Sequence, residues 1–151
     1  MREQVIQMVE EEKIIAIVRG IDAEKGMKVA DALYEGGIRL MEITFDQKNP
    51  DSFPVTANAI AEIGAKYQGR MLVGAGTVTT PELVELAAKA GAKYIISPDV
   101  NVEVIRRTRE LGLVSMPGAM TPSEVMTAHN AGADYVKLFP AGELGTSYVK
   151  A

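Results

Sequence analysis

The chain has 151 residues, which is enough for one domain with a sizeable buried core. Its 16 basic and 20 acidic residues give a net charge of -4 without a cluster of lysines and arginines, which argues against nucleic acid and anionic membranes as partners. Cysteine is absent from the sequence, so a disulfide scaffold, a thiolate nucleophile and a cysteine metal site are excluded.

The first residues, 2–10, form an amphipathic and acidic segment that predicts a helix and lacks the long apolar core of a signal peptide. No later run of uncharged apolar residues is long enough to span a bilayer. We therefore expect a soluble, cytoplasmic protein without a membrane partner.

Strands and helices are then expected to alternate along the chain. Runs of β-branched and other apolar residues predict strands at 14–18, 38–45, 71–77, 94–96, 113–116 and 135–138. Capping residues, helix-opening prolines and terminal glycines predict helices at 22–36, 51–67, 80–90, 102–111 and 121–131, and a further helix is expected to start near 147. This repeat of strand and helix, about 20 to 25 residues long, indicates a parallel sheet with helices outside it.

Two folds fit that repeat, a (β/α) barrel and an open doubly wound sheet. In a barrel every strand end contributes to one mouth, whereas in an open sheet only the ends near the switch point need polar residues. The carboxyl ends of the predicted strands supply polar or turn residues: Arg19, Glu42 with Thr44, Thr77, Ser97-Pro98, Pro117-Gly118 and Lys137. We therefore predict an α/β fold of the TIM (β/α)8 barrel type.

The predicted domain, residues 1–151, contains about six strand-helix units and lacks the last two strands of such a barrel with their helices. Either the chain is a fragment of a longer barrel or another chain supplies the missing strands. Because an incomplete barrel exposes strand edges and its apolar inner face, we expect the chain alone not to be an active monomer.

Lys137 lies within the apolar run 135–138, where a lysine is rarely placed without a function. A lysine taken out of water has a lowered pKa and is partly a free amine, which can attack a ketone to form a Schiff base. The alternative is that the side chain snorkels, its stem covering apolar surface while its ammonium reaches water.

Glu42 is the only carboxylate embedded in a predicted strand and directed at the predicted mouth. It can serve as the general acid/base that Schiff-base aldol chemistry needs, unless it is a solvated residue at a strand end. Thr77 offers a hydroxyl that can hold a substrate carboxylate or ketone oxygen. Gly74 and Gly76 would let the backbone approach a ligand, although such a Gly-x-Gly pair usually marks only a tight loop.

Five motifs, in register along the chain, closely resemble those of the bacterial 2-keto-3-deoxy-6-phosphogluconate (KDPG) / 4-hydroxy-2-oxoglutarate (KHG) aldolase family. They are Glu42-Ile43-Thr44, Gly74-Ala75-Gly76-Thr77-Val78, Ser97-Pro98, Met116-Pro117-Gly118 with Thr121-Pro122, and Val136-Lys137-Leu138-Phe139-Pro140. The resemblance implies that Lys137 forms the Schiff base with the C2 ketone and that Glu42 is the general acid/base. It further implies that Thr77 binds the pyruvate part of the substrate and that Pro98 shapes the pocket wall.

Members of this family cleave KDPG to pyruvate and glyceraldehyde 3-phosphate, and many also split KHG to pyruvate and glyoxylate. The resemblance therefore implies a class I aldolase with a small 2-keto acid as substrate and pyruvate as product. It also implies that no metal or other cofactor is needed and that the protein is a homo-oligomer, commonly a trimer.

Two departures from the family pattern bear on the substrate. Some members carry an arginine shortly after the glutamate strand, where this sequence reads Phe45-Asp46-Gln47. Arg19, at the end of the first strand, could clamp the substrate carboxylate instead; otherwise it is a surface residue. The second departure is that strands seven and eight, whose loops bind the phosphate in the family, have no counterpart in this sequence.

Other functions stay open at this point. The same scaffold could act on 2-keto-3-deoxy-6-phosphogalactonate, because the sequence does not reveal the stereochemical preference. The chain could also be a non-catalytic truncated fragment, or a barrel that binds a phosphorylated ligand with Lys137 as a charge clamp. His129, the only histidine, lies on a predicted helix and is expected at the surface, so neither a histidine metal site nor a histidine triad is predicted.

Overall fold

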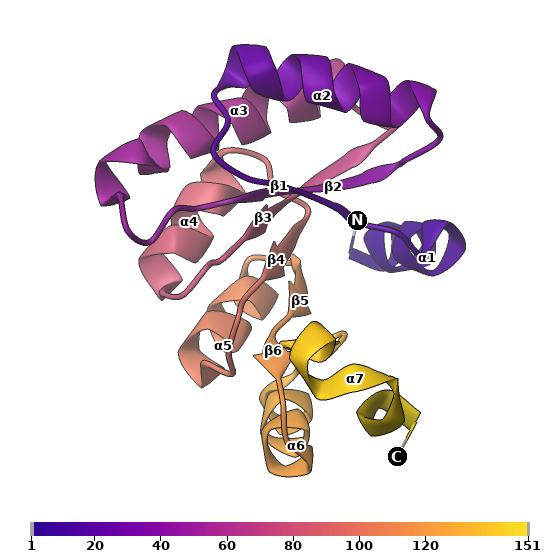
Figure 1. The fold of residues 1–151 in the computed structure, drawn as a ribbon. Coiled ribbons are helices and arrows are strands. Elements are labelled where there is room, and N and C mark those ends of the chain that lie inside the picture. Colours follow the sequence, from indigo (N-terminus) through magenta and orange to yellow (C-terminus); the bar gives the residue numbers. More distant parts are fainter. Residues whose placement is uncertain (1, 151) are drawn as a thin grey trace.

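Strands and helices alternate through residues 2–150, which are the residues that the computed structural model describes (Figure 1). Five strands form one parallel sheet in the order of the chain: β1 (Ala16–Val18), β2 (Leu40–Thr44), β3 (Leu72–Gly76), β4 (Tyr94–Ile96) and β5 (Val114–Met116). Two shorter strands, β6 (Gly118–Ala119) and β7 (Lys137–Leu138), pair with each other in parallel. The predicted parallel α/β class is therefore confirmed.

β6 follows β5 after a single proline, so β7 extends the sheet by one more strand position. The backbone N–H of Tyr135 donates to the carbonyl of Ser115 at 3.2 Å, and that of Lys137 donates to the carbonyl of Pro117 at 2.9 Å. Within residues 2–150, β1 does not pair with β7, and the ring of strands is open between these two edges.

The helices that follow Asp22, Thr80 and Thr121 begin where local capping predicts. Seven α-helices accompany the strands within residues 2–150. They are α1 (Arg2–Glu12), α2 (Ala23–Glu35), α3 (Phe53–Lys66) after the short 3-10 helix η1 (Pro50–Ser52), α4 (Pro81–Lys89), α5 (Val102–Glu110), α6 (Pro122–Ala131) and α7 (Ala141–Lys150). The Asp22 side chain accepts a hydrogen bond from the backbone N–H of Lys25 at 2.8 Å, and Thr121 with Glu124 forms the expected capping box of α6. None of the helices in residues 2–150 is both long and apolar enough to cross a membrane.

Both faces of the sheet are buried, but against different elements. Outward side chains such as Met41 and Ile43 pack against the helices that follow the strands, and inward ones such as Leu40 and Tyr94 pack with Val5 of α1. Figure 1 shows α2 to α5 along one side of the strands and α1 on the other. Because side chains alternate along a strand, this arrangement directs Glu42 to the inner face.

Several predicted boundaries differ from those observed, and three of the differences bear on the site or the chain end. The strand predicted at 14–18 begins at Ala16, and the one predicted at 135–138 is regular only at Lys137–Leu138. The N–H groups of Asp134 and Tyr135 both donate to Ser115 O, so regular pairing with the neighbouring strand starts only after them. The last helix begins at 141 and not near 147, and it is interrupted at Gly145, which has non-helical backbone angles.

Candidate active site

The inner face of the sheet borders a cavity of about 250 Å³ whose lining includes both Lys137 and Glu42. The rest of the lining is mainly apolar and comes from α1, β1, β4, β5 and the segment before β7: Val9, Ile15, Ile17, Ile96, Met116, Tyr135 and Val136. Lys137 and Glu42, the two residues for which the sequence predicts catalytic roles, thus share one largely apolar cavity.

Lys137 begins β7, and its side chain is half-buried. Its Nζ atom lies 4.7 Å from the centroid of the Phe139 ring, which is within the range of a cation–π contact. Phe139 directly follows β7, so the amine and the ring lie on the same side of the chain at the end of this strand. The hydrogen bond from the Lys137 N–H to Pro117 fixes the backbone beneath the amine.

Glu42 is buried in the middle of β2, with 3% of its surface exposed. Burial raises the pKa of its carboxyl above the ordinary value of a glutamate, and the positive charges of Lys137 and Arg19 counteract part of that rise. A carboxyl of this kind holds its proton to higher pH than a surface glutamate does. That property suits a group that has to give and take a proton near neutral pH.

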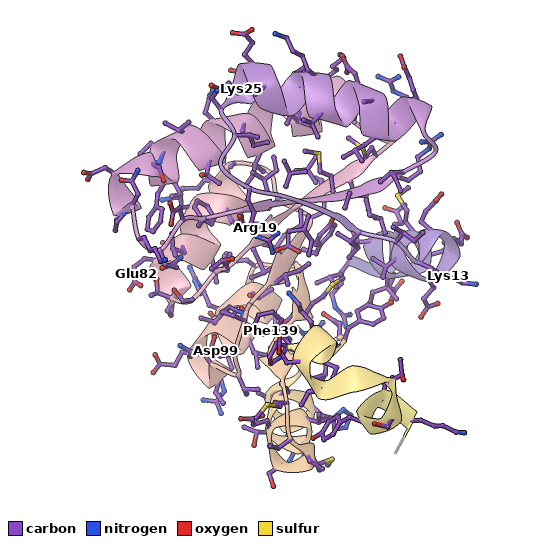
Figure 2. All side chains as sticks on the ribbon, in the orientation of Figure 1. Lys13, Arg19, Lys25, Glu82, Asp99 and Phe139 are labelled. Carbon is purple, nitrogen blue, oxygen red and sulfur yellow. The ribbon has the colours of Figure 1, made fainter. Side chains whose placement is uncertain are left out.

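Arg19 directly follows β1 and is exposed. Its positive charge counteracts part of the rise in the pKa of the Glu42 carboxyl. In the view of Figure 2, Arg19 lies over the middle of the strands, whereas Lys13 and Lys25 lie at the rim. Arg19 thus lies at the end of the first strand, as predicted, but it is not part of the cavity lining.

Thr77 follows β3 at the same edge of the sheet but does not line the cavity. Its φ of 56° lies in the left-handed region, which β-branched residues rarely adopt. Gln47 supports this turn, because its Nε2 donates to the Thr77 carbonyl at 2.8 Å and its Oε1 accepts from the Thr79 hydroxyl at 3.1 Å. Gln47, which belongs to the segment where some family members carry an arginine, is here part of a loop contact.

Pro98 lies two residues after β4, half-buried and also outside the cavity lining. A Cβ atom added to Gly118 would lie 2.4 Å from the Pro98 carbonyl oxygen, so the β4 and β6 ends are in close contact. Of the five predicted site residues, Lys137 and Glu42 therefore line the cavity, and Arg19, Thr77 and Pro98 lie at the ends of neighbouring strands.

Two features of the site did not follow from the sequence pattern. Gly74 and Gly76 do not leave room for a ligand, because the space above them is filled by Tyr94 and Glu42 respectively. Asp134, three residues before the lysine, has a side chain only 4% exposed and anchors the approach to β7. The sequence held a signal for Asp134, because a polar residue there opens an apolar run. Nothing local indicated that side chains fill the space above the two glycines.

Asp134 joins three elements. Its carboxylate accepts hydrogen bonds from Arg109 Nη1 at 2.8 Å, from the backbone N–H of Ser115 at 2.9 Å and from the guanidinium of Arg2. These partners belong to α5, β5 and α1, so the segment that leads to Lys137 is tied to the rest of the inner face.

A family model described as KDPG and KHG aldolase matches residues 5–151. The probable 2-dehydro-3-deoxy-6-phosphogalactonate aldolase of Rhizobium meliloti is 40% identical over 141 residues, which are 93% of this chain and 64% of that protein. The 2-dehydro-3-deoxy-phosphogluconate aldolase of Treponema pallidum is 36% identical, with the same 93% and 64% covered. The chain thus spans somewhat less than two thirds of the length of these relatives.

Solved structures give the same result for the fold. The KDPG aldolase from Legionella pneumophila, with pyruvate captured at low pH as a covalent carbinolamine intermediate, matches with a TM-score of 0.79 at 29% identity. The match covers 90% of this chain and 63% of that one. The arrangement of strands and helices in residues 2–150 is therefore that of the barrel-type aldolases.

Proposed function

The chain belongs to the KDPG and KHG aldolase family, and from that premise we propose that it is a class I aldolase that works through a Schiff base on Lys137. The proposed reaction is cleavage of 2-keto-3-deoxy-6-phosphogluconate to pyruvate and glyceraldehyde 3-phosphate, and of 4-hydroxy-2-oxoglutarate to pyruvate and glyoxylate. The observation that carries the proposal is the single, mainly apolar cavity that Lys137 and the buried Glu42 both line.

Lys137 and Glu42 have complementary tasks in this reaction. The Lys137 amine attacks the C2 ketone, and loss of water from the carbinolamine leaves a cationic iminium that can accept electrons. Glu42 removes the proton of the C4 hydroxyl, the C3–C4 bond breaks, and its electron pair moves through C3 to the iminium nitrogen, which gives an enamine. Protonation of the enamine carbon by Glu42 restores the iminium, and water then releases pyruvate and the free amine.

The other site residues receive supporting roles in the proposal. Arg19 and Thr77 bind the carboxylate of the substrate, the first through its charge and the second through its hydroxyl, and Pro98 forms part of the wall. All three follow strands whose carboxyl ends meet at the same edge of the sheet as Glu42.

We also propose that the domain is part of an eight-unit barrel. Residues 1–151 would supply six strand-helix units of an eight-unit barrel, and two further units would close the gap between β1 and β7. The open ring in residues 2–150 and the 64% coverage of the relatives support this reading. A trimeric assembly and a cytoplasmic location stay predictions.

A second candidate reaction is cleavage of 2-keto-3-deoxy-6-phosphogalactonate. The observation that favours it is the 40% identity to the Rhizobium meliloti protein named for that substrate. The two substrates are epimers, so their rates of cleavage by the same preparation, measured side by side, distinguish the two candidates.

Release of pyruvate from these substrates, followed through lactate dehydrogenase and NADH, tests the proposed function. We expect Lys137→Met to abolish release and Glu42→Gln to slow it by about 10² to 10⁴-fold, the usual contribution of a general acid/base. Lys25→Met, at an exposed lysine on α2, is the matched control and should leave the rate unchanged. Pyruvate release that survives Lys137→Met would contradict the proposal and favour a ligand-binding barrel.

A further inference from the structure

The inner face of β3 has two glycines, and a side chain from a neighbouring strand covers each of them. A Cβ atom added to Gly74 would lie 2.0 Å from Cε2 of Tyr94, which is on β4. At Gly76 it would lie 1.7 Å from Oε1 of Glu42, which is on β2. Carbon atoms in contact are about 3.5 to 4.0 Å apart, so neither position accepts a methyl group while its neighbour stays in place.

The backbone does not require glycine at either position. Neither Gly74 nor Gly76 has a φ in the left-handed region, and both pair regularly with β2, opposite Glu42 and Thr44 respectively. An alanine could adopt the same backbone angles. A side chain added at either position would therefore clash with Tyr94 or Glu42.

Tyr94, on β4, holds β2, the strand that carries Glu42. It is completely buried, and its hydroxyl donates to the carbonyl of Met41 at 2.7 Å. Met41 directly precedes Glu42, so this hydrogen bond ties the backbone beside the carboxylate to β4, across the bare backbone of Gly74. Burial raises the pKa of Tyr94 well above its ordinary value, which keeps the hydroxyl protonated as a donor.

We propose that Gly76 and Tyr94 are positioning residues for the aldolase reaction. The Glu42 carboxylate packs directly against the backbone of Gly76, which has no side chain to displace it, and Tyr94 fixes the strand that carries Glu42. The inference rests on the proposed function, since the position of the carboxylate matters for catalysis only if Glu42 moves protons. A displacement of about 1 Å at a reacting group lowers a rate by about 100-fold.

A partial reaction on pyruvate alone isolates the contribution of Glu42. Enamine formation removes a methyl proton from pyruvate bound to Lys137, so exchange of the methyl protons in D2O, followed by NMR, reports the proton transfer. Borohydride trapping reports the adduct on Lys137 separately. For Gly76→Ala we expect exchange to slow about 100-fold, while the extent of trapped adduct at saturating pyruvate is unchanged.

The matched control is Gly64→Ala on α3, where an added Cβ has no atom within 4 Å. It should change neither exchange nor trapping. Tyr94→Phe keeps the ring and removes the hydroxyl, with its hydrogen bond to Met41 and its longer contact of 3.4 Å with the Leu72 carbonyl. We expect exchange to slow by about tenfold, the effect of one lost hydrogen bond. If the unaltered chain exchanges pyruvate protons and Gly76→Ala matches Gly64→Ala, the inference is wrong while the proposed function stands.

The pH dependence separates positioning from general damage to the fold. A carboxylate pushed off the Gly76 backbone regains water, so the acid limb of the exchange profile in Gly76→Ala should move toward the pH of an ordinary glutamate. Purely structural damage would lower the rate by the same factor at every pH and leave the limb in place.

If Gly76→Ala alone folds poorly, the melting temperatures of single and double variants still test whether Gly76 positions the carboxylate. Glu42→Ala removes the three atoms that the new Cβ would meet, Oε1, Cδ and Cγ of Glu42. The loss in Tm caused by Gly76→Ala should therefore be much smaller in the Glu42→Ala background than in the unaltered chain. An equal loss in both backgrounds would show that Gly76 does not seat the carboxylate. Absence of both adduct and exchange in the unaltered, folded chain would instead contradict the proposed function.

Discussion

Glu42 and Lys137 line one cavity but differ in how far each is withdrawn from water. Glu42 is 3% exposed, whereas Lys137 is half-buried beside the Phe139 ring. The sequence predicted that both residues point to one mouth, because their places at strand ends are local features. It did not predict that the carboxylate would be the deeper of the two, because that depth depends on Tyr94 and other side chains from distant strands.

Replacing Glu42 with glutamine should stabilise the folded chain at neutral pH. The folded-state pKa of Glu42 is raised, so the cost of ionising the buried carboxyl is absent below the unfolded pKa of about 4.3 and grows as pH rises from there through the folded pKa. Each unit of the rise corresponds to about 1.4 kcal/mol. Urea unfolding of Glu42→Gln should therefore show a gain in stability that is larger at about pH 8 than at about pH 5.

The control for this measurement is Glu62→Gln on α3, at an exposed glutamate whose carboxylate accepts a hydrogen bond from Asn58. Its effect on the free energy of unfolding should be small at both pH values. A gain from Glu42→Gln that is equal at both pH values, or larger in acid, would contradict the account of Glu42.

Arg19→Met should change the pH dependence of cleavage. Because Arg19 lowers the pKa of Glu42, its removal should raise that pKa further and move the acid limb of the kcat/KM profile to higher pH. Loss of the charged hydrogen bond to the substrate carboxylate should also raise KM by about 10 to 100-fold. Lys25→Met serves as the control, and an acid limb that stays in place in Arg19→Met would exclude Arg19 from the site.

Helix starts and strand starts differ in how well the sequence predicts them. The N-caps at Asp22, Thr80 and Thr121 were predictable because capping involves residues three or four positions apart. The start of β7 was not, because it is set by pairing with Ser115, far away in the sequence. The Asp134 anchor belongs to the same non-local class, since its partners lie on α1, α5 and β5.

Asp134→Asn should weaken the attachment of β7 to the inner face. The carboxylate is buried against Arg2 and Arg109, whose side chains are 34% and 33% exposed, so we expect a loss of about 2 kcal/mol, below that of a fully buried pair. Urea unfolding measures the loss, and Asp99→Asn, at an exposed aspartate, is the control. Equal stability of the two variants would show that Asp134 does not anchor β7.

The order of strands and helices in the whole molecule was predictable, because each unit carries its own hydrophobic pattern and turn residues. The division of the core into one cluster on each face of the sheet was not predictable. α1 lies on the inner face, where Val5 packs with Leu40 and Tyr94 and Val9 lines the cavity, although the acidic helix gave no sign of which elements it covers. The gap between β1 and β7 in residues 2–150 leaves one side of that inner face without a strand.

Covalent capture of pyruvate on the 151-residue chain tests the central claim most directly. The folded chain is incubated with pyruvate and borohydride, and the intact and peptide masses are recorded, with Lys137→Met treated in parallel. The account predicts a reduced pyruvate adduct on the peptide that contains Lys137 and none in the variant. Adduct formation needs only Lys137 and the cavity that it lines, both of which this chain contains. A folded chain that gives no adduct, or that is modified equally at another lysine such as Lys93, would therefore contradict the account.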